Sequence, residues 1–259
     1  MEVEPDTRVN PEPKEAVRRH WQVAPCGDKL AASERGSPAY FAEVEATRYR
    51  AEPFIPAFAE FGRWRDRRVL EVGVGLGTDF VQFARAGARL SGIDLTEAAV
   101  DLTTRRLQLD DLEAELRIGD AERLPFQDES FDLVYSWGVL HHTPDTTRAI
   151  SEVHRVVKPG GEARIMLYGR HSWVGYGLWI RYALLRGRPR RSLADVIANH
   201  MESPGTKAYT TDELRAMFGA FSSVEFDRWV TPYDRRVAGP FARFLGSRLG
   251  WFVGIRAVR

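Results

Sequence analysis

The feature that most constrains the fold is a glycine-rich turn between an apolar run and a helical pattern. Residues 69–79 read VLEVGVGLGTD, so Gly73, Gly75 and Gly77 alternate directly after a β-branched segment. Glycine adopts backbone angles that other residues avoid, and it lets a ligand approach the main chain where a Cβ would obstruct it. A helix that follows would direct its unpaired N–H groups toward an electron-rich ligand. The stretch therefore predicts a buried strand, a tight turn and a helix, with a ligand over the turn.

The spacing of the glycines narrows the class of ligand. They follow G-x-G-x-G, whereas the dinucleotide fingerprint is G-x-G-x-x-G and a Walker loop ends in Gly-Lys-Ser/Thr. NAD, FAD and a Walker-type phosphate loop are therefore disfavoured. The next predicted strand, residues 89–95, carries Asp94 near its end, and a carboxylate there can accept both hydroxyls of a ribose. The sequence indicates a ligand that contains a nucleoside.

These residues resemble motif I of the class I S-adenosylmethionine-dependent methyltransferases, with Asp94 in the place of that family's ribose-binding acid. The resemblance implies S-adenosyl-L-methionine as cofactor and S-adenosyl-L-homocysteine as product. It also implies that Glu71 and the glycine turn hold the methionine part and that Thr78 contacts the cofactor. Taken alone, such a turn could also be a strand–helix corner without a ligand, so its neighbours decide between the two interpretations.

A third predicted strand, residues 115–120, brings another acid to the same edge of the sheet. In the family that the turn resembles, an Asp-Ala pair here binds adenine. Asp120 would accept a hydrogen bond from the exocyclic amine, and the backbone N–H of Ala121 would donate to a ring nitrogen. Leu95 would supply an apolar surface for the ring, and Glu122 would belong to the same part of the site. Asp120 could instead cap a helix, but acids at three successive strand ends favour the adenine role.

The fourth predicted strand spans residues 131–138 and is followed by the segment 139–145. Together they contain Phe-Asp-Leu-Val, Leu-His-His and Pro-Asp. These motifs resemble the ubiquinone and menaquinone methyltransferase-like branch (methyltransferase type 11). The resemblance places Trp137 near the methionine end of the cofactor. His141 or His142 could accept a proton from an acceptor hydroxyl or amine, since imidazole titrates near neutral pH. The pair could instead only shape the loop, and methyl transfer need not require a base, because the sulfonium is already activated. No metal site is expected, since adjacent histidines point apart and no acidic partner lies at ligand spacing.

Residues 14–65 predict two or three helices ahead of the sheet, broken near Pro53. In many class I methyltransferases such helices fold over the cofactor, and an aromatic or basic side chain meets the methionine carboxylate. Tyr40, Arg48 and Tyr49 are the candidates for this contact. Alternatively, the tyrosines are packing residues and Arg48 lies on a solvated face.

The fold class follows from the order of the motifs. Lys-Pro-Gly-Gly at residues 158–161, followed by an apolar strand at 162–168, is a further landmark of the family, and the matches span residues 66–169. We therefore expect an α/β fold with a doubly wound, mostly parallel sheet of seven strands, a Rossmann-like methyltransferase fold. The ligand would lie at the carboxyl edge where strand order reverses. Residues 224–230 and 251–258 are expected to form an antiparallel pair at the edge of the sheet.

Residues 170–208 are expected to be a helical lid over the acceptor, inserted after the fifth strand. Three candidate acceptor-binding residues, Trp173, Tyr176 and Trp179, recur with Tyr182 at three-residue steps, which we interpret as one shared helix face. That face could bind an apolar or aromatic acceptor or simply cover the core. Five arginines between residues 181 and 191 could meet an anionic group of the substrate or form a solvated face.

The expected divisions of the chain are a disordered tail (1–13), an N-terminal helical cap (14–65), a cofactor-binding core (66–169), the acceptor lid (170–208) and a C-terminal completion of the sheet (209–259). Within the last of these, residues 233–249 are expected to form a surface helix.

Composition limits the remaining possibilities. The chain is 44% apolar and 28% charged, which is ordinary for a soluble globular protein, and its net charge of +1 gives no global reason to expect nucleic acid or an anionic membrane as a partner. Cys26 is the single cysteine, so no intramolecular disulfide forms. No run approaches the roughly 20 apolar residues of a membrane span, and the N-terminus does not read as a signal peptide. A cytoplasmic monomer or homodimer is expected.

The sequence thus predicts a methyltransferase that uses S-adenosylmethionine and acts on a small-molecule acceptor by direct displacement. The lid composition favours an apolar or aromatic metabolite of specialised biosynthesis, with oxygen, nitrogen and carbon acceptors all open. Two alternatives belong to other classes. One is an RNA or protein methyltransferase, which the arginine run would suit, and the other is a cofactor-binding protein without transfer activity.

Overall fold

The fold is built on one seven-stranded sheet. The structure is a computed structural model and describes residues 13–201, 203, 205–243 and 246–259. The strands are β1 (Arg68–Val72), β2 (Arg89–Asp94), β3 (Glu115–Ile118), β4 (Phe131–Trp137), β5 (Val157–Tyr168), β6 (Ser223–Trp229) and β7 (Phe252–Val258). Their order in space is β3-β2-β1-β4-β5-β7-β6. The first five strands pair in parallel, while β7 pairs antiparallel with both β5 and β6. The expected doubly wound, mostly parallel sheet with an antiparallel edge pair is confirmed.

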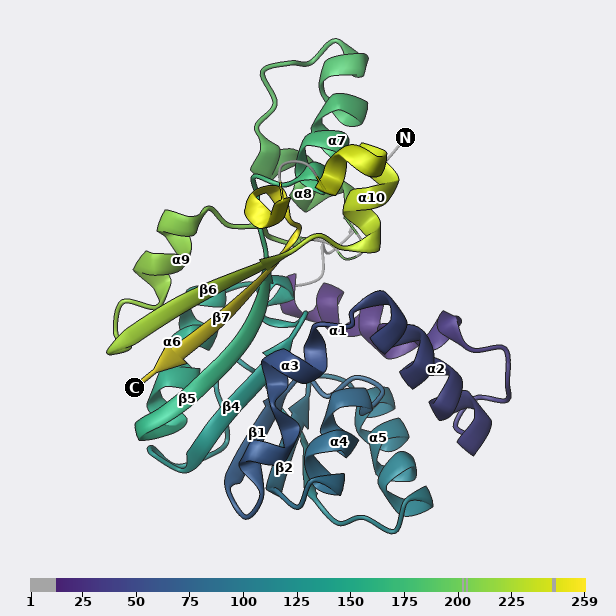
Figure 1. Cartoon of the computed structure of the whole chain (residues 1–259), viewed down its shortest axis with the longest axis vertical. Helices are drawn as coiled ribbons and strands as arrows, with labels where there is room; N and C mark the ends of the chain where they lie inside the picture. Colours follow the sequence, from purple (N-terminus) through teal and green to yellow (C-terminus); the bar gives the residue numbers. More distant parts are fainter. Residues whose placement is uncertain (1–12, 202, 204, 244–245) are drawn as a thin grey trace, which may run out of the picture.

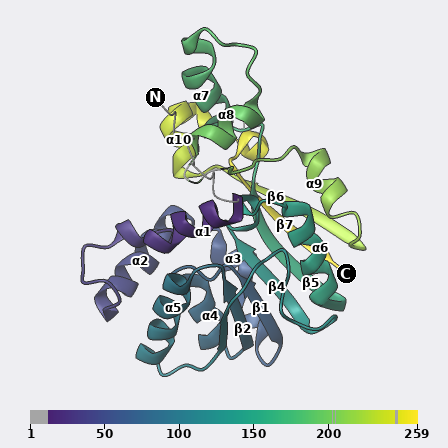
Figure 2. The same cartoon turned by 180° about the vertical axis from the view of Figure 1, so that it is seen from behind.

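Helices cover both faces of this sheet (Figures 1 and 2). The helices that flank the sheet are α4 (Thr78–Arg85), α5 (Glu97–Leu109), α6 (Thr146–Val156) and α9 (Thr211–Met217). Neighbouring residues of a strand point to opposite faces, so Val69 packs with Phe80 and Phe83 of α4, whereas Leu70 packs with Ile150 and Val153 of α6. The two apolar cores are therefore separated by the sheet itself.

The chain begins with helices that lie ahead of the sheet, as expected. They are α1 (Pro13–Val23), α2 (Pro38–Ala51) and α3 (Ile55–Ala59), with short 3₁₀ turns at Asp28–Leu30 and Phe61–Trp64. α2 starts at Ser37, whose side chain accepts from the Tyr40 amide, with Pro38 in the first turn. The tail predicted at residues 1–13 falls almost entirely outside the described residues.

An insertion after β5 rises above the carboxyl edge of the sheet (Figure 1). It contains α7 (Trp173–Tyr182), a 3₁₀ turn at Leu184–Arg186 and α8 (Leu193–His200). α10 (Pro232–Ala238), from the connection between β6 and β7, packs beside α7, since a Cβ at Gly177 would lie 2.5 Å from Val237 Cγ1. Within the described part of the chain, no helix combines the length and apolar character needed to cross a membrane.

Two sequence expectations differ from the observed elements. β5 begins at Val157 rather than at 162, because Val157 already pairs with Phe131 before an irregularity in the register with β4. The single surface helix expected at 233–249 ends at Ala238 and gives way to 3₁₀ turns at Gly239–Arg243 and Gly246–Leu249. Pro240 explains the break, because its ring clashes with a continuing α-helix and it has no N–H to donate.

Candidate functional site

The predicted cofactor residues converge on one edge of the sheet. β1, β2, β3 and β4 are neighbours and parallel, so Glu71, Asp94, Asp120 and Trp137 all lie at or just beyond their carboxyl ends. Strand order reverses between β1 and β4, which opens a crevice at this edge in doubly wound sheets. The structure thus brings together residues that are up to 66 positions apart in the sequence.

The glycine turn connects β1 to α4 in a backbone conformation that favours glycine. Its three glycines have φ values of 82°, 54° and 68° at Gly73, Gly75 and Gly77. A Cβ on Gly73 would lie 2.3 Å from Val139 Cγ2, and one on Gly77 would lie 2.9 Å from Thr103 Cγ2. A Cβ on Gly75 would meet no described atom within 4 Å. Two glycines therefore serve close packing, while the space beside Gly75 is available to a ligand.

Asp94 is held in place by the turn it faces. Its Oδ2 accepts from the Gly75 amide at 3.1 Å, and its Oδ1 accepts from the Thr96 amide at 3.0 Å and the Thr96 hydroxyl at 2.8 Å. Burial raises the pKa of the Asp94 carboxyl, although these hydrogen bonds oppose the shift. The carboxylate is therefore oriented before any ligand arrives.

Glu71 is the most unusual group at this edge. Its side chain is 3% exposed, and its Oε2 has no hydrogen-bond partner among the described residues. Burial raises the pKa of Glu71 well above its ordinary value, and the carboxylates of Asp79 and Asp94 raise it further. A buried, unsatisfied carboxyl is costly for stability, and a cationic or hydrogen-bond-donating ligand would relieve that cost.

Asp79 collects the polar side chains next to Glu71, and we did not single it out from the sequence. Its carboxylate accepts from Arg48 Nη2 at 3.0 Å, Tyr49 Oη at 2.9 Å and Tyr135 Oη at 2.8 Å. Arg48 therefore reaches the site, and its buried Nε has no partner in the described part of the chain. The sequence does place Asp79 in the first turn of a helix directly after the glycine turn. An acid at that position usually only stabilises the positive end of the helix dipole, so the sequence did not point to a site residue.

Trp137 closes the same region from β4. Its indole Nε1 donates to Glu52 Oε2 at 2.8 Å, and its ring packs among Phe54, Phe58 and Trp229. Burial raises the pKa of the Glu52 carboxyl, although Arg48 opposes the shift. Trp137 thus separates the polar cluster around Asp79 from an aromatic core.

The predicted adenine residues lie under the first helix. Lys14 of α1 donates to Asp120 Oδ2 at 2.5 Å and to Glu122 Oε2 at 2.6 Å. Burial opposes the charge of Lys14, but these hydrogen bonds outweigh it and the pKa of Lys14 is raised. Asp120 Oδ1 also accepts from the Glu122 amide at 2.9 Å. Ala121 is buried and Leu95 is half-buried beside them.

Two predicted cofactor residues face other partners in this structure. The Tyr40 hydroxyl donates to Asp28 Oδ1 at 2.5 Å, and its ring packs in a small apolar cluster with Leu76. The Thr78 hydroxyl accepts from Arg106 Nη1 at 3.2 Å. Their proposed contacts with the cofactor stay predictions without support from the side-chain geometry.

The histidine pair follows β4 in a 3₁₀ turn, η3 (Leu140–His142). His141 is fully buried, its ring centroid lies 3.8 Å from that of Tyr168, and neither ring nitrogen has a hydrogen-bond partner among the described residues. Burial lowers its pKa well below the ordinary value. His142 Nδ1 lies 2.8 Å from Ser203 Oγ and 3.1 Å from Thr206 Oγ1. Burial lowers the pKa of His142 to about 3, so both rings are neutral near pH 7.

The aromatic residues of α7 do not share one face, contrary to the expectation. Three residues advance an α-helix by about 300°, so four residues at three-residue steps drift around the axis, and the first and last lie half a turn apart. Trp179 Nε1 donates to the Arg191 carbonyl at 2.8 Å, and Tyr182 stacks on His200 at 3.9 Å. These two residues fasten α7 to the following loop and to α8.

Trp173 and Tyr176, at the start of α7, have different surroundings. Trp173 Nε1 is buried without a hydrogen-bond partner among the residues that the structure describes. The Tyr176 hydroxyl lies 3.0 Å from His171 Nδ1 on the surface. Of the three candidate acceptor residues, Trp173 alone presents a buried, unsatisfied donor.

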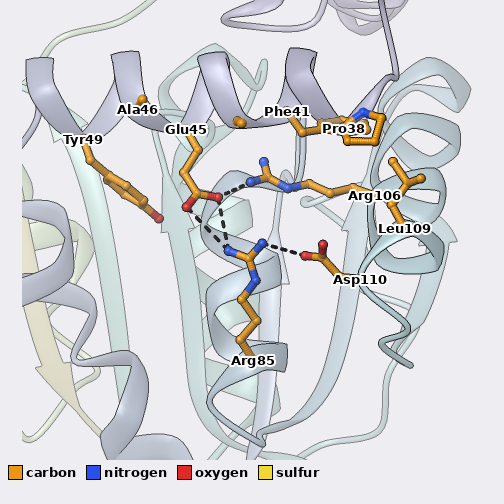
Figure 3. Close-up of a pocket in the computed structure, with 10 residues that line it drawn as sticks. Pro38, Phe41, Glu45, Ala46, Tyr49, Arg85, Arg106, Leu109 and Asp110 are labelled. Atoms are coloured by element: carbon orange, nitrogen blue, oxygen red, sulfur yellow. Dashed lines mark hydrogen bonds and ion pairs between the residues drawn. The ribbon is translucent and has the colours of Figure 1, made fainter.

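A cavity of about 420 Å³ lies elsewhere, between α2 and the helices α4 and α5 (Figure 3). Of the residues predicted to meet the cofactor, Tyr49 alone lines this cavity. Arg85 is 3.3 Å from Glu45 and 2.7 Å from Asp110, and Arg106 also pairs with Glu45. The opposite charges are balanced within the wall, so the cavity offers no net charge to a ligand and is not assigned a function.

Comparison with known proteins identifies the core. Residues 70–165 match a family described as a methyltransferase domain. Demethylmenaquinone methyltransferase of Streptomyces avermitilis is 29% identical over 150 residues, which cover 58% of this chain and 61% of that protein. Phthiotriol/phenolphthiotriol dimycocerosates methyltransferase 1 of Mycobacterium ulcerans is 42% identical over 97 residues, which cover 37% and 35%. The chain thus spans less than two thirds of the length of these curated relatives.

Solved structures with low sequence identity share the fold. Phosphoethanolamine N-methyltransferase 2 of Haemonchus contortus, solved with phosphomonomethylethanolamine and S-adenosylhomocysteine, has a TM-score of 0.60 at 17% identity and covers 81% of this chain and 52% of that one. The [4+2]-cyclase SpnF has a TM-score of 0.54 at 15% identity, covering 89% and 85%. The same fold is therefore also found in a protein named for a chemistry other than methyl transfer, so the fold alone does not decide function.

Proposed function

Residues 70–165 of this chain match a methyltransferase domain family, and from this premise we propose that the protein transfers a methyl group from S-adenosylmethionine to a small-molecule acceptor. The observation that carries the proposal is the carboxyl edge of the sheet, to which β1, β2 and the end of β3 each bring an acid and where a Cβ on Gly75 would meet no described atom within 4 Å. A ligand with a cationic part, a ribose and an adenine would offer each of these acids a partner.

The proposed cofactor contacts use the chain's own unsatisfied or exchangeable groups. Glu71 Oε2, which lacks a partner in the described part of the chain, would accept from a donor on the methionine part. Asp94 would accept from the ribose hydroxyls while staying anchored by the Gly75 amide. Asp120 would accept from the adenine amine, and the Ala121 N–H would donate to the ring. Arg48, held by Asp79, is the proposed partner of the methionine carboxylate.

The cofactor supplies an electrophilic methyl group on a sulfonium, so the protein's own part is to bind, orient and exclude water. Trp137, whose ring packs with Phe54, Phe58 and Trp229, is the proposed residue that excludes water beside that methyl group. We propose His141 as the group that accepts a proton from the acceptor where one must be removed. Its neutral ring and its ring nitrogens, which have no hydrogen-bond partner among the described residues, leave it able to accept a proton, whereas its lowered pKa makes it a weak base.

The proposed acceptor is an apolar or aromatic metabolite. The insertion after β5 supplies the buried, unsatisfied indole nitrogen of Trp173 as a donor for it. Two relatives are named for acceptors of this general kind, demethylmenaquinone and phthiotriol dimycocerosates. The fold does not determine which atom of the acceptor receives the methyl group. Analysis of the methylated product identifies that atom.

Incubation with methyl-labelled S-adenosylmethionine and fractionated extracts of the source cell tests the proposed function. We expect label in a small, organic-soluble product with the wild-type chain and none with Asp94→Ala. Label in RNA or protein would contradict the small-molecule assignment. Tight cofactor binding without any labelled product would instead support a binding protein without transfer activity.

The role of His141 needs a separate comparison. Single-turnover transfer by His141→Ala is expected to be slowed about 100-fold or more if it accepts the proton, with cofactor affinity unchanged. His142→Ala is the matched neighbour and is expected to lose less. Equal, wild-type rates in both variants would remove the histidines as proton acceptors.

A further inference from the structure

The segment between α7 and α8 forms the end of the molecule that lies far above the sheet (Figures 1 and 2). We call this surface the tip and define it by its exposed residues, which are Ile180, Arg181, Leu184, Leu185, Arg186, Arg188 and Arg190. Trp179 and Tyr182 anchor it from below through Arg191 and His200. The tip is therefore a fixed feature of the insertion and lies apart from the residues proposed to bind the cofactor.

Large apolar side chains of the tip face solvent. Leu185 is 75% exposed, Leu184 is 47% exposed and Ile180 is 45% exposed. Three aliphatic side chains within six residues form an exposed patch, which in a soluble protein commonly marks a contact surface. None of them belongs to the two cores beside the sheet.

The same surface carries a concentrated positive charge. Residues 181–191 contain five arginines and no acid, whereas the whole chain has a net charge of +1, so the remainder is net negative. Arg191 pairs with Asp195 at 2.6 Å, but Arg181, Arg186, Arg188 and Arg190 form no ion pair within the described part of the chain. α10, packed beside α7, adds the exposed Arg235 and Arg236.

We propose that the tip docks on the surface of an anionic phospholipid bilayer. A bilayer interface offers an apolar layer for the leucines and negatively charged headgroups for the arginines at the same place. Nucleic acid would match the arginines but give the exposed leucines no partner. The inference goes beyond the proposed function, because it concerns binding by a surface that contains no proposed cofactor residue.

Flotation of the full chain with vesicles tests the proposal directly. Vesicles of phosphatidylcholine with phosphatidylglycerol are compared with vesicles of phosphatidylcholine alone, at low and high salt. We expect binding to the anionic vesicles only, weakened by salt because exposed charges are screened. Arg186→Glu/Arg188→Glu/Arg190→Glu should reduce the bound fraction at least about tenfold, and Leu184→Ser/Leu185→Ser should reduce it severalfold.

A matched variant controls for net charge. The control makes the same Arg→Glu change at three exposed arginines outside the insertion, as Arg50→Glu/Arg65→Glu/Arg89→Glu. This variant should bind vesicles like the wild type. Unchanged far-ultraviolet circular dichroism and melting temperature establish that each variant is folded. Absence of vesicle binding by the wild type, or equal loss in the control variant, would overturn the proposal. So would tighter binding to a single-stranded RNA that depends on the arginines and not on the leucines.

Discussion

At the scale of single residues, the account depends on buried groups that lack the partners their chemistry requires. Glu71 has a buried carboxyl oxygen without a hydrogen-bond partner among the described residues. Both ring nitrogens of His141 are also buried without one. Unsatisfied buried polar atoms are rare in folded proteins and call for an explanation. A ligand that completes these hydrogen bonds is the explanation we propose.

Glu71 leads to a prediction about protons. Because burial raises its pKa, its carboxyl holds a proton up to a higher pH than an exposed glutamate. A donor or cation bound beside it favours the ionised form, so cofactor binding should release a proton and weaken as pH falls. Calorimetry in two buffers of different ionisation enthalpy measures this release. Glu71→Gln should abolish it and weaken binding by about 1.5–3 kcal/mol, and an unchanged proton balance in Glu71→Gln would contradict the assignment.

His142 leads to a prediction about stability. Its pKa is about 3 in the folded chain and 6.5 in the reference state, so the unfolded chain binds more protons as pH falls below 6.5. The stabilisation is complete above that pH and is lost on acidification, at about 1.4 kcal/mol per pH unit for one proton. Urea unfolding between pH 4.5 and 6 should show a slope reduced by this amount in His142→Asn. The exposed His171→Asn serves as control, and equal slopes in both variants would refute the prediction.

At the scale of elements, the glycine turn separates packing from binding. Gly73→Ala brings a Cβ within 2.3 Å of Val139, whereas Gly75→Ala meets open space at a similar positive φ. We expect Gly75→Ala to cost about 1–2 kcal/mol of stability, from the left-handed backbone alone, and Gly73→Ala to cost about 1–3 kcal/mol more. Gly75→Ala should nevertheless weaken S-adenosylhomocysteine binding, because its Cβ occupies the proposed ligand space. Thermal unfolding and calorimetry on both variants distinguish the effects. Normal affinity in Gly75→Ala would place the ligand elsewhere.

The first helix gives a second prediction at this scale. Lys14 pairs with both Asp120 and Glu122, so it occupies the acceptors proposed for adenine. Lys14→Met should tighten S-adenosylhomocysteine binding severalfold and change stability by less than about 1 kcal/mol, since the pair is partly exposed. Arg18→Met, which removes an ion pair with Glu15 inside α1, should leave the affinity unchanged. Weaker binding in Lys14→Met would mean that Lys14 assists closure of α1 rather than competing for the acids.

The elements also show how far sequence could reach. Apolar runs such as residues 131–137 and the alternation of strands with helices predicted the sheet, and motif spacing predicted which acids meet at its edge. The contact between Lys14 and Asp120 could not be predicted, because it joins residues 106 positions apart through the path of an N-terminal helix. The gathering of Arg48, Tyr49 and Tyr135 on Asp79 escaped for the same reason.

Helix geometry accounts for the error in the insertion. A three-residue repeat does not follow the 3.6-residue turn, so Trp173 and Tyr182 diverge around α7 instead of forming one aromatic face. Tyr182 stacks on His200 and Trp179 donates to the carbonyl of Arg191, and both partners come from the segment that follows the helix. Counting along a single helix could not identify these partners, because the fold of the next loop determines them.

At the scale of the whole molecule, charge and topology act at different places. A net charge of +1 predicts no anionic partner, yet residues 181–191 concentrate positive charge on the tip while the rest of the chain is net negative. The reversal of strand order between β1 and β4 places the proposed cofactor site at the carboxyl edge below. The tip is thus suited to an anionic bilayer surface, while the carboxyl edge of the sheet is suited to a nucleoside ligand.

The central claim is that carboxylates at successive strand ends hold an adenosyl ligand. Titration calorimetry of S-adenosylhomocysteine into the wild type, Asp94→Ala, Asp120→Ala and the exposed control Asp101→Ala tests it most directly. We predict saturable binding by the wild type and the control, and at least about tenfold weaker binding in each of the two site variants. No binding by the wild type, or unchanged affinity in both site variants, would contradict the account.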